Sequence, residues 1–278
     1  MSDIGFMQGR LSPRVDGKIQ AFPWQHWQDE FRLARRHGFP IMEWTIDQDR
    51  LRDNPLMTRD GRALIRRLGD ENGVRVRSLT GDCFMQSPFY KLEGIERAAR
   101  LDDLDALVDA CAEIGVRYVL IPLVDNGSLT APEHESTLLE TLLERAPRFQ
   151  ERGIVVVFES DFGPSRLAEF IDRFPAETFG INYDIGNSAA LGFDTRGEIA
   201  AYGSRIVNVH VKDRVLGGTT VPLGTGNADF PATFEALAAA RYRGDYILQT
   251  ARAADDDHAG VLVRYRERVR SLLDRYGS

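Results

Sequence analysis

The chain has 278 residues, close to the roughly 250 residues of a typical one-domain α/β barrel, so we expect one domain over residues 1–278. With 43% hydrophobic residues and no apolar run near the roughly 20 residues needed to cross a bilayer, the sequence predicts no membrane span. The formal net charge of −7 argues against nucleic-acid binding, which depends on clustered excess lysine and arginine. We therefore expect the partner to be a small molecule.

Neither the N-terminal segment nor the cysteine content indicates export. The segment MSDIGFMQGR does not contain the charged start and apolar stretch of a secretory signal, so a cytoplasmic location is expected. Cys83 and Cys111 are too few and too far apart for a disulfide framework or a thiolate metal cluster. We predict that both are buried thiols.

Eight short runs rich in β-branched and aromatic residues predict eight strands. In chain order they are IGFM, IMEWTI, VRVRSLTG, RYVLIPLV, IVVVFES, FGINYDIG, RIVNVHVKD and DYILQTAR. Segments in which apolar residues recur at helical spacing lie between most of these runs, and one more closes the chain. These predicted helices span residues 24–37, 58–71, 94–114, 133–152, 165–174, 231–240 and 258–276.

The alternation of strands and helices predicts a parallel sheet, and eight repeats in this length favour its closure into a single (β/α)8 TIM barrel. A dinucleotide-binding sheet is less well supported, because no Gly-x-Gly-x-x-Gly turn follows the first strand. The segment 215–230 is predicted to be a long functional loop after the seventh strand. Glycines that lie shortly before strands predict left-handed helix caps, and these are Gly38, Gly73, Gly115, Gly153 and Gly244.

Polar side chains close the last four predicted strands, and each of them can bind a metal. They are Glu159 in FES, Asp184 in YDIGN, His210 in NVHVKD and Gln249 in ILQ. The carboxyl ends of barrel strands share one mouth, so these side chains are expected to converge. Burying a carboxylate in an apolar run is costly unless a cation compensates its charge. The sequence therefore predicts one divalent metal ion held by these four residues, with a metal-free polar pocket as the alternative.

The same motifs, with the opening strand GFMQGRLSP, resemble the sugar phosphate isomerase/epimerase family of xylose isomerase-like TIM barrels in the AP endonuclease 2-type superfamily. The resemblance covers essentially the entire chain and is most specific over the fifth to seventh strands. It includes ketose 3-epimerases, hydroxypyruvate isomerase and inosose dehydratase, and more distantly endonuclease IV. The resemblance implies that Glu159, Asp184, His210 and, with one change, Gln249 bind a divalent ion.

Two positions depart from the pattern of the family. Gln249 stands in place of a second metal-binding glutamate, and an amide can coordinate a metal through its oxygen but cannot act as a base. Epimerisation by two bases then needs a substitute, whereas a one-base isomerisation through Glu159 needs none. Asn187 stands where epimerases of the family commonly carry a histidine. Endonuclease chemistry is less favoured, because only His210 of the five histidines lies at a strand end.

The resemblance implies chemistry by proton transfer through a metal-held enediolate, with the ion as Lewis acid. We expect Glu159 to be the catalytic base and Lys212, two residues beyond His210, to protonate or steady an enediolate oxygen. Ligands that are mostly hard oxygens favour Mn²⁺ or Mg²⁺, and Zn²⁺ or Co²⁺ also fit.

The substrate is expected to be a small sugar or sugar phosphate. Arginines just after strands suit a phosphate or carboxylate, and acidic or amide side chains there suit sugar hydroxyls or the orientation of ligands. The predicted substrate-binding residues are Arg10, Glu43, Asp82, Asn187, Asp213, Arg214 and Arg252. The alternatives to an isomerase or epimerase are a keto-polyol dehydratase and a non-catalytic barrel that binds a sugar or metal. Members of the family often form dimers or tetramers, and no feature of this sequence decides whether the chain is a homo-oligomer.

Overall fold

A computed structural model of the chain describes residues 2–277 and contains a closed barrel of eight parallel strands. The strands are β1 (Ile4–Met7), β2 (Ile41–Thr45), β3 (Arg75–Thr80), β4 (Tyr118–Leu123), β5 (Val155–Ser160), β6 (Phe179–Asp184), β7 (Ile206–Val211) and β10 (Asp245–Leu248). Around the barrel their order is β1-β10-β7-β6-β5-β4-β3-β2, so the first and last strands pair and close the sheet. The predicted single (β/α)8 barrel and its eight strands are confirmed.

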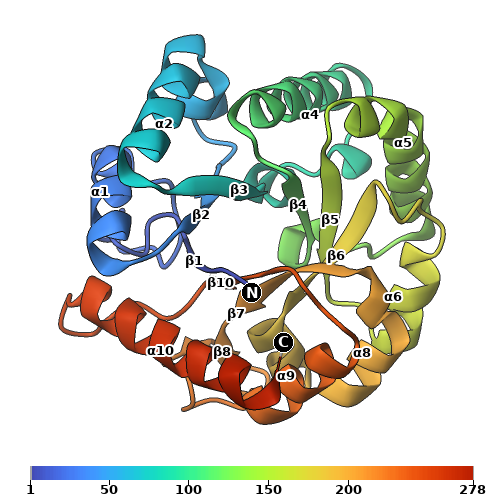
Figure 1. Ribbon diagram of the computed structural model, residues 1–278. Coiled ribbons are helices and arrows are strands. Elements are labelled where there is room, and N and C mark those ends of the chain that lie inside the picture. Colours follow the sequence, from blue (N-terminus) through green and yellow to red (C-terminus); the bar gives the residue numbers. More distant parts are fainter. Residues whose placement is uncertain (1, 278) are drawn as a thin grey trace.

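Helices surround the barrel on all sides, with α1 and α10 next to each other where the chain closes its ring (Figure 1). The outer helices are α1 (Trp27–His37), α2 (Arg59–Asn72), α4 (Gly94–Ile114), α5 (Pro132–Glu151), α6 (Pro164–Ile171), α8 (Thr195–Tyr202), α9 (Phe230–Ala239) and α10 (His258–Tyr276). Short 3-10 turns occupy Leu51–Asp53, Pro55–Met57, Phe89–Lys91, Asp125–Gly127 and Gly203–Arg205. The seven predicted helices are all present, with ends that shift by up to a few residues.

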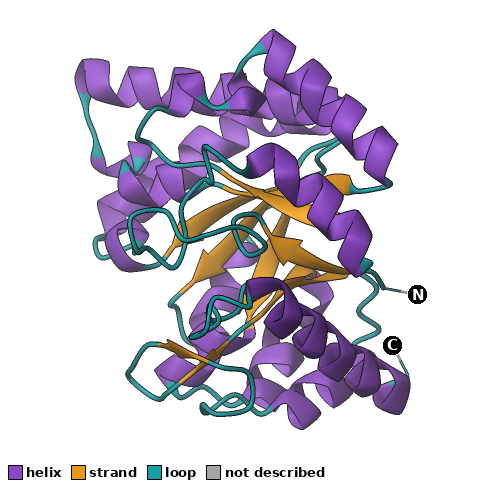
Figure 2. Cartoon of the chain, turned by 90° about the vertical axis from the view of Figure 1, so that its left-hand side faces the viewer, coloured by secondary structure: helices purple, strands orange, loops and turns teal. Residues whose placement is uncertain are grey.

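Four small elements at the carboxyl ends of strands were not predicted. Helix α3 (Asp82–Gln86) directly follows β3, and α7 (Ile185–Leu191) directly follows β6. Both are too short for apolar spacing to reveal them. The long loop after β7 carries a two-stranded antiparallel sheet of β8 (Asp213–Arg214) and β9 (Thr220–Val221), at the lower left of Figure 2.

The side chains of β5 show how the sheet separates two environments. Val156 and Phe158 belong to the main apolar core with the helices, whereas Val155 and Val157 form a separate cluster with Leu120. Side chains of a strand alternate between faces, so this separate cluster lies on the inner face of the barrel. Glu159 continues the row of Val155 and Val157, which directs its carboxylate inward at the carboxyl end of the strand.

Cys83 and Cys111 are buried and free, as predicted. No helix within residues 2–277 is long and apolar enough to cross a membrane.

Four of the five predicted glycine caps are confirmed. Gly38, Gly73, Gly115 and Gly153 have φ values of 71°, 65°, 85° and 67°, the left-handed region that closes a helix cheaply only for glycine.

The prediction for Gly244 is wrong, because α9 ends at Ala239 and Arg241 takes the positive φ of 59°. A Cβ on Gly244 would lie 2.3 Å from Tyr242 Oη and 2.6 Å from the carbonyl oxygen of Val207. Close packing therefore explains this glycine.

We predict that Gly244→Ala lowers the free energy of unfolding by about 1–3 kcal/mol, the usual cost of overpacking a tight site. Urea denaturation monitored by circular dichroism measures the change. Gly73→Asn is the matched control. A Cβ added at position 73 would meet no atom within 4 Å, and asparagine tolerates the left-handed conformation of this position. Equal losses in the two variants would refute the packing explanation.

Candidate metal centre

A cavity of about 540 Å³ opens at the carboxyl ends of the barrel strands. Asp82 follows β3, Glu159 lies on β5, Lys212 follows β7 and Gln249 follows β10, and all four line it. Active sites of this fold lie at this end of the barrel, because the loops that follow the strands meet there.

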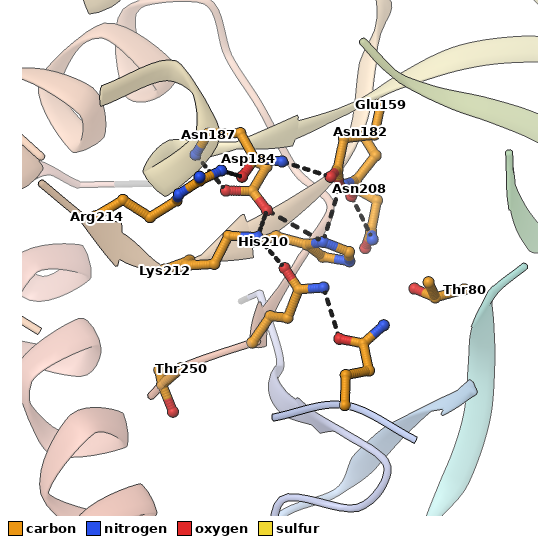
Figure 3. A network of polar contacts seen from close by, with 12 residues as sticks. Thr80, Glu159, Asn182, Asp184, Asn187, Asn208, His210, Lys212, Arg214 and Thr250 are labelled. Atoms are coloured by element: carbon orange, nitrogen blue, oxygen red, sulfur yellow. Dashed lines mark hydrogen bonds and ion pairs between the residues drawn. The ribbon is translucent and has the colours of Figure 1, made fainter. Parts of the chain in front are cut away.

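Three ionisable side chains meet where Glu159 lines this cavity. Glu159, Asp184 and His210 each offer one ligand atom, and these atoms lie within 4.8 Å of one another. His210 Nδ1 lies 3.2 Å from Glu159 Oε2 and 3.8 Å from Asp184 Oδ2. Figure 3 shows the three side chains pointing towards one another from adjacent strands.

The chemistry of this trio fits a divalent cation. All three residues are buried, and within residues 2–277 His210 Nδ1 has no hydrogen-bond partner, while Asp184 Oδ2 is in an ion pair with Lys212. Buried polar atoms are normally satisfied, and two carboxylates beside an imidazole form a donor set that hard or borderline divalent ions accept. The three side chains can therefore hold a metal ion.

Glu43, on β2, contacts the His210 ring on the side opposite to Glu159 and Asp184. His210 Nε2 lies 2.7 Å from Glu43 Oε1, and the same carboxylate accepts hydrogen bonds from Thr80 Oγ1 at 2.6 Å and Asn208 Nδ2 at 3.1 Å. Burial opposes the ionisation of Glu43, but the charge of His210 and the hydrogen bonds from His210, Ser78 and Thr80 together hold the pKa of Glu43 below its ordinary value. Burial lowers the pKa of His210, but the attraction of Glu43 and the contacts with Asp184 and Glu159 together raise it well above its ordinary value.

The contact between Glu43 and His210 orients the imidazole. A proton on Nε2 that is donated to Glu43 leaves Nδ1 directed at Glu159 and Asp184, an arrangement common among metal-binding histidines. Because the Glu43 carboxylate faces His210, Thr80 and Asn208, it is occupied by protein groups. The structure thus places Glu43 on the side of His210 away from Glu159 and Asp184, whereas the sequence had suggested a contact with substrate.

Lys212 and Gln249 form the side of the site next to Asp184. The Lys212 ammonium lies 2.7 Å from Asp184 Oδ2 and donates to Gln249 Oε1 at 2.8 Å. Although burial acts in the other direction, the charge of Lys212 and the contacts of His210 hold the pKa of Asp184 below its usual range. Gln249 Nε2 donates to Gln20 Oε1 at 3.0 Å. The Gln249 oxygen therefore points toward Lys212 and its nitrogen points toward Gln20.

Gln20 is a site residue that the sequence did not reveal. It lies in the loop between β1 and α1 and lines the cavity. It follows no strand end directly and belongs to no motif, so only the path of this loop brings it to the mouth of the barrel.

Asn187 links Glu159 to the other polar groups of the mouth. Its backbone N–H donates at 2.8 Å to Asp184 Oδ1, the side-chain cap of α7, while its Nδ2 donates to Glu159 Oε1 at 2.7 Å. Its Oδ1 accepts from Arg214 Nη1 at 2.8 Å, and Asn182 Nδ2 donates to Glu159 Oε2 at 2.7 Å. Both Glu159 oxygens are thus held by amide donors, and Asn187 and Arg214 line the cavity beside them (Figure 3).

Three other predicted substrate-binding residues, Arg10, Arg252 and Asp213, bind backbone groups of the surrounding loops. Arg10 donates to the carbonyl oxygens of Thr250 and Ile19, and Arg252 donates to those of Gly9 and Ser12.

Asp213 accepts hydrogen bonds from the backbone N–H groups of Gly224, Gly226 and Ala228. Arg10, Arg252 and Asp213 therefore hold loops around the mouth. Asp82 does line the cavity and accepts a hydrogen bond from Gln20 Nε2 at 2.5 Å.

Comparison with known proteins gives one family and several relatives. The sequence model of the xylose isomerase-like TIM barrel family matches residues 31–270. The L-ribulose-5-phosphate 3-epimerase of Shigella boydii serotype 18 is 26% identical over 259 residues, which cover 90% of this chain and 91% of the relative.

Solved structures with the same fold include a xylose isomerase domain protein from Planctomyces limnophilus, with a TM-score of 0.77, 17% identity and coverage of 99% and 98% of the two chains. They also include a D-allulose 3-epimerase from Methylomonas sp., with a TM-score of 0.76, 17% identity and 98% coverage of both chains.

We predict that Glu43→Ala lowers the free energy of unfolding by about 3–5 kcal/mol in the presence of a chelator, because it leaves a buried partner charge uncompensated. Chemical denaturation measures the loss. Glu113→Ala is the control, because it removes an ion pair at the surface. Glu113 Oε2 lies 2.5 Å from Arg62 Nε, and 38% of the Glu113 side chain is exposed. Such surface pairs contribute less than about 1 kcal/mol. A small loss for Glu43→Ala would show that Glu43 does not stabilise the His210 side chain.

Proposed function

Because the chain belongs to the xylose isomerase-like TIM barrel family, we propose that it is a divalent-metal-dependent epimerase or isomerase of a small keto-sugar or sugar phosphate. The observation that carries the proposal is the buried trio of Glu159, Asp184 and His210, in which His210 Nδ1 has no hydrogen-bond partner within residues 2–277 and Glu159 lines a cavity. The names of the relatives support this reaction class, since they are epimerases of ribulose phosphate and of D-allulose.

Glu159, Asp184, His210 and the amide oxygen of Gln249 would hold the ion. Bound there, a divalent ion supplies Lewis acidity that makes the C–H bond beside a ketose carbonyl more acidic. The oxygen-rich donor set favours Mn²⁺ or Mg²⁺, and Zn²⁺ or Co²⁺ also fit. Lys212 contacts the oxygens of Asp184 and Gln249, so its ammonium competes with the ion for both.

Glu159 is the proposed base. The amides of Asn182 and Asn187 fix its carboxylate at the cavity surface, where it can remove a proton from the carbon next to a substrate carbonyl. Lys212 lies in the same cavity with its ammonium toward Asp184, in a position to donate a proton or hydrogen bond to the oxygen that gains charge. Asn187 and Arg214 supply further polar groups for substrate hydroxyls.

We predict that Mn²⁺ stabilises the protein and that Asp184→Asn largely abolishes this effect. At a concentration about 100 times its dissociation constant, a ligand of the folded state adds about 2.7 kcal/mol, so the melting temperature should rise by several degrees. Calorimetry of metal-free protein with and without Mn²⁺ measures the shift.

The control for the metal experiment is Asp103→Asn. Asp103 is a buried carboxylate outside the cavity, paired with Arg52 at 2.6 Å and Arg100 at 3.1 Å. This variant should keep the full response to Mn²⁺. Equal responses in Asp184→Asn and the parent protein would place the ion elsewhere.

We predict that Glu159→Gln reduces product formation from a keto-sugar by at least about 100-fold, the usual contribution of a general base. Glutamine keeps an oxygen that can coordinate a metal, so the assay is made at Mn²⁺ concentrations that saturate the variant in the calorimetric measurement. Product analysis by NMR separates the epimer, the aldose and a dehydrated product. Unchanged turnover would exclude Glu159 as the base, and loss of water would identify the reaction as that of a lyase.

A further inference from the structure

The inference concerns the second proton transfer that an epimerase needs, and it rests on the proposed function. Epimerisation inverts one carbon, so a proton removed from one face must be replaced by a proton delivered to the opposite face. A carboxylate fixed at the end of β5, as Glu159 is, reaches one face only. At the end of β10 the chain carries Gln249, whose amide cannot exchange a proton in this way.

Besides Glu159, the carboxylic side chains that line the cavity within residues 2–277 are Asp47, Asp82, Asp125 and Asp161. Asp82 is the buried one, with 8% of its surface exposed, while the other three are partly or fully exposed. Its position is set by the chain turn after β3. A Cβ on the preceding Gly81 would lie 2.8 Å from the carbonyl oxygen of Leu120, so this turn packs directly against β4. Asp82 is therefore a fixed part of the cavity wall.

Asp82 lies on the wall that faces the metal centre. In the closed strand order, β3 stands opposite β7, which carries His210. Glu159 comes from β5, two strands from β3 in the ring, and both Glu159 and Asp82 line the cavity, so a molecule in it can contact both carboxyl groups.

A single amide joins Asp82 to Gln249. Gln20 Nε2 donates to Asp82 Oδ2 at 2.5 Å, and Gln20 Oε1 accepts from Gln249 Nε2 at 3.0 Å. The Asp82 carboxyl is thus the acidic group that the hydrogen-bond network places next to Gln249. Asp82 therefore lies near the end of β10, where the chain carries Gln249 and no carboxylate base.

We propose that Asp82 is the second acid–base residue of this site and exchanges a proton with the face of the reacting carbon opposite to Glu159. Burial raises the pKa of Asp82 to about 7, against the hydrogen bond from Gln20 and with the help of the negative charges of Asp47 and Glu159. Both protonation states of Asp82 are therefore populated near neutral pH, which suits a group that donates in one direction and accepts in the other.

The proton balance of the reaction is complete with these two residues. Glu159 takes the proton as the C–H bond breaks, and the electron pair moves toward the carbonyl oxygen to give an enediolate. Asp82 then gives its carboxyl proton to the same carbon from the other face, and a new C–H bond forms. Glu159 ends protonated and Asp82 ends ionised, and exchange with water resets both. In the reverse direction the two residues exchange roles.

The test compares the parent protein, Asp82→Asn and Glu159→Gln in D₂O with saturating Mn²⁺. The probes are L-ribulose and its 3-epimer L-xylulose, each with and without a 5-phosphate, and NMR follows both epimer formation and deuterium at carbon 3 of the recovered starting sugar. We expect Asp82→Asn to lower epimer formation by at least about 100-fold. Deuterium should still enter the epimer whose proton Glu159 removes, and should no longer enter the other. Glu159→Gln should show the reverse pattern.

This mirror-image pattern separates a catalytic role of Asp82 from a structural one. Asp82→Asn must keep the Mn²⁺ response in calorimetry, which verifies its fold and its metal centre, and Asp103→Asn should behave as the parent protein does. The inference is overturned if Asp82→Asn forms epimer normally, if it loses exchange from both epimers equally, or if the parent protein makes only an aldose. If the parent protein gives neither product nor exchange with any of these sugars, the proposed function itself fails.

Discussion

The burial of three ionisable side chains at one point is the constraint on which the rest of the site depends. Glu159, Asp184 and His210 come from adjacent strands and lie within a few ångströms of one another in a buried setting. Charges withdrawn from water are costly unless partners compensate them. Glu43 and Lys212 compensate part of this cost. His210 Nδ1, which has no hydrogen-bond partner within residues 2–277, faces the two carboxylates, and a cation held there would compensate the remainder.

The pairing of the barrel strands makes this arrangement possible. Asp184 and His210 are register partners in the pairing of β6 with β7, so their side chains start side by side. Glu159 arrives in the same layer because β5 alternates inward and outward along its length. Residues that lie far apart in the sequence, such as Glu43 and His210, meet because the closed sheet brings the ends of strands that are not neighbours within reach of one mouth.

Much of this could be predicted from the sequence, because apolar runs of strand length mark the strands and each of the last four closes with a polar side chain. The contacts beyond the strand ends could not be predicted. Gln20 reaches the mouth through the path of a loop, and α3 is too short to be recognised from its apolar spacing. Arg10 and Arg252 look like substrate ligands in the sequence, yet their guanidinium groups bind carbonyl oxygens of the loops, which no local pattern encodes.

Anomalous X-ray diffraction from crystals of the protein soaked with Mn²⁺ locates the metal ion itself. We expect one strong anomalous peak between the Glu159 and Asp184 carboxylates and His210 Nδ1, with the Gln249 oxygen within coordination distance. A map with no peak at this place, or a Lys212 ammonium that remains bonded to Asp184 while the ion binds elsewhere, would rule out this trio as the metal centre.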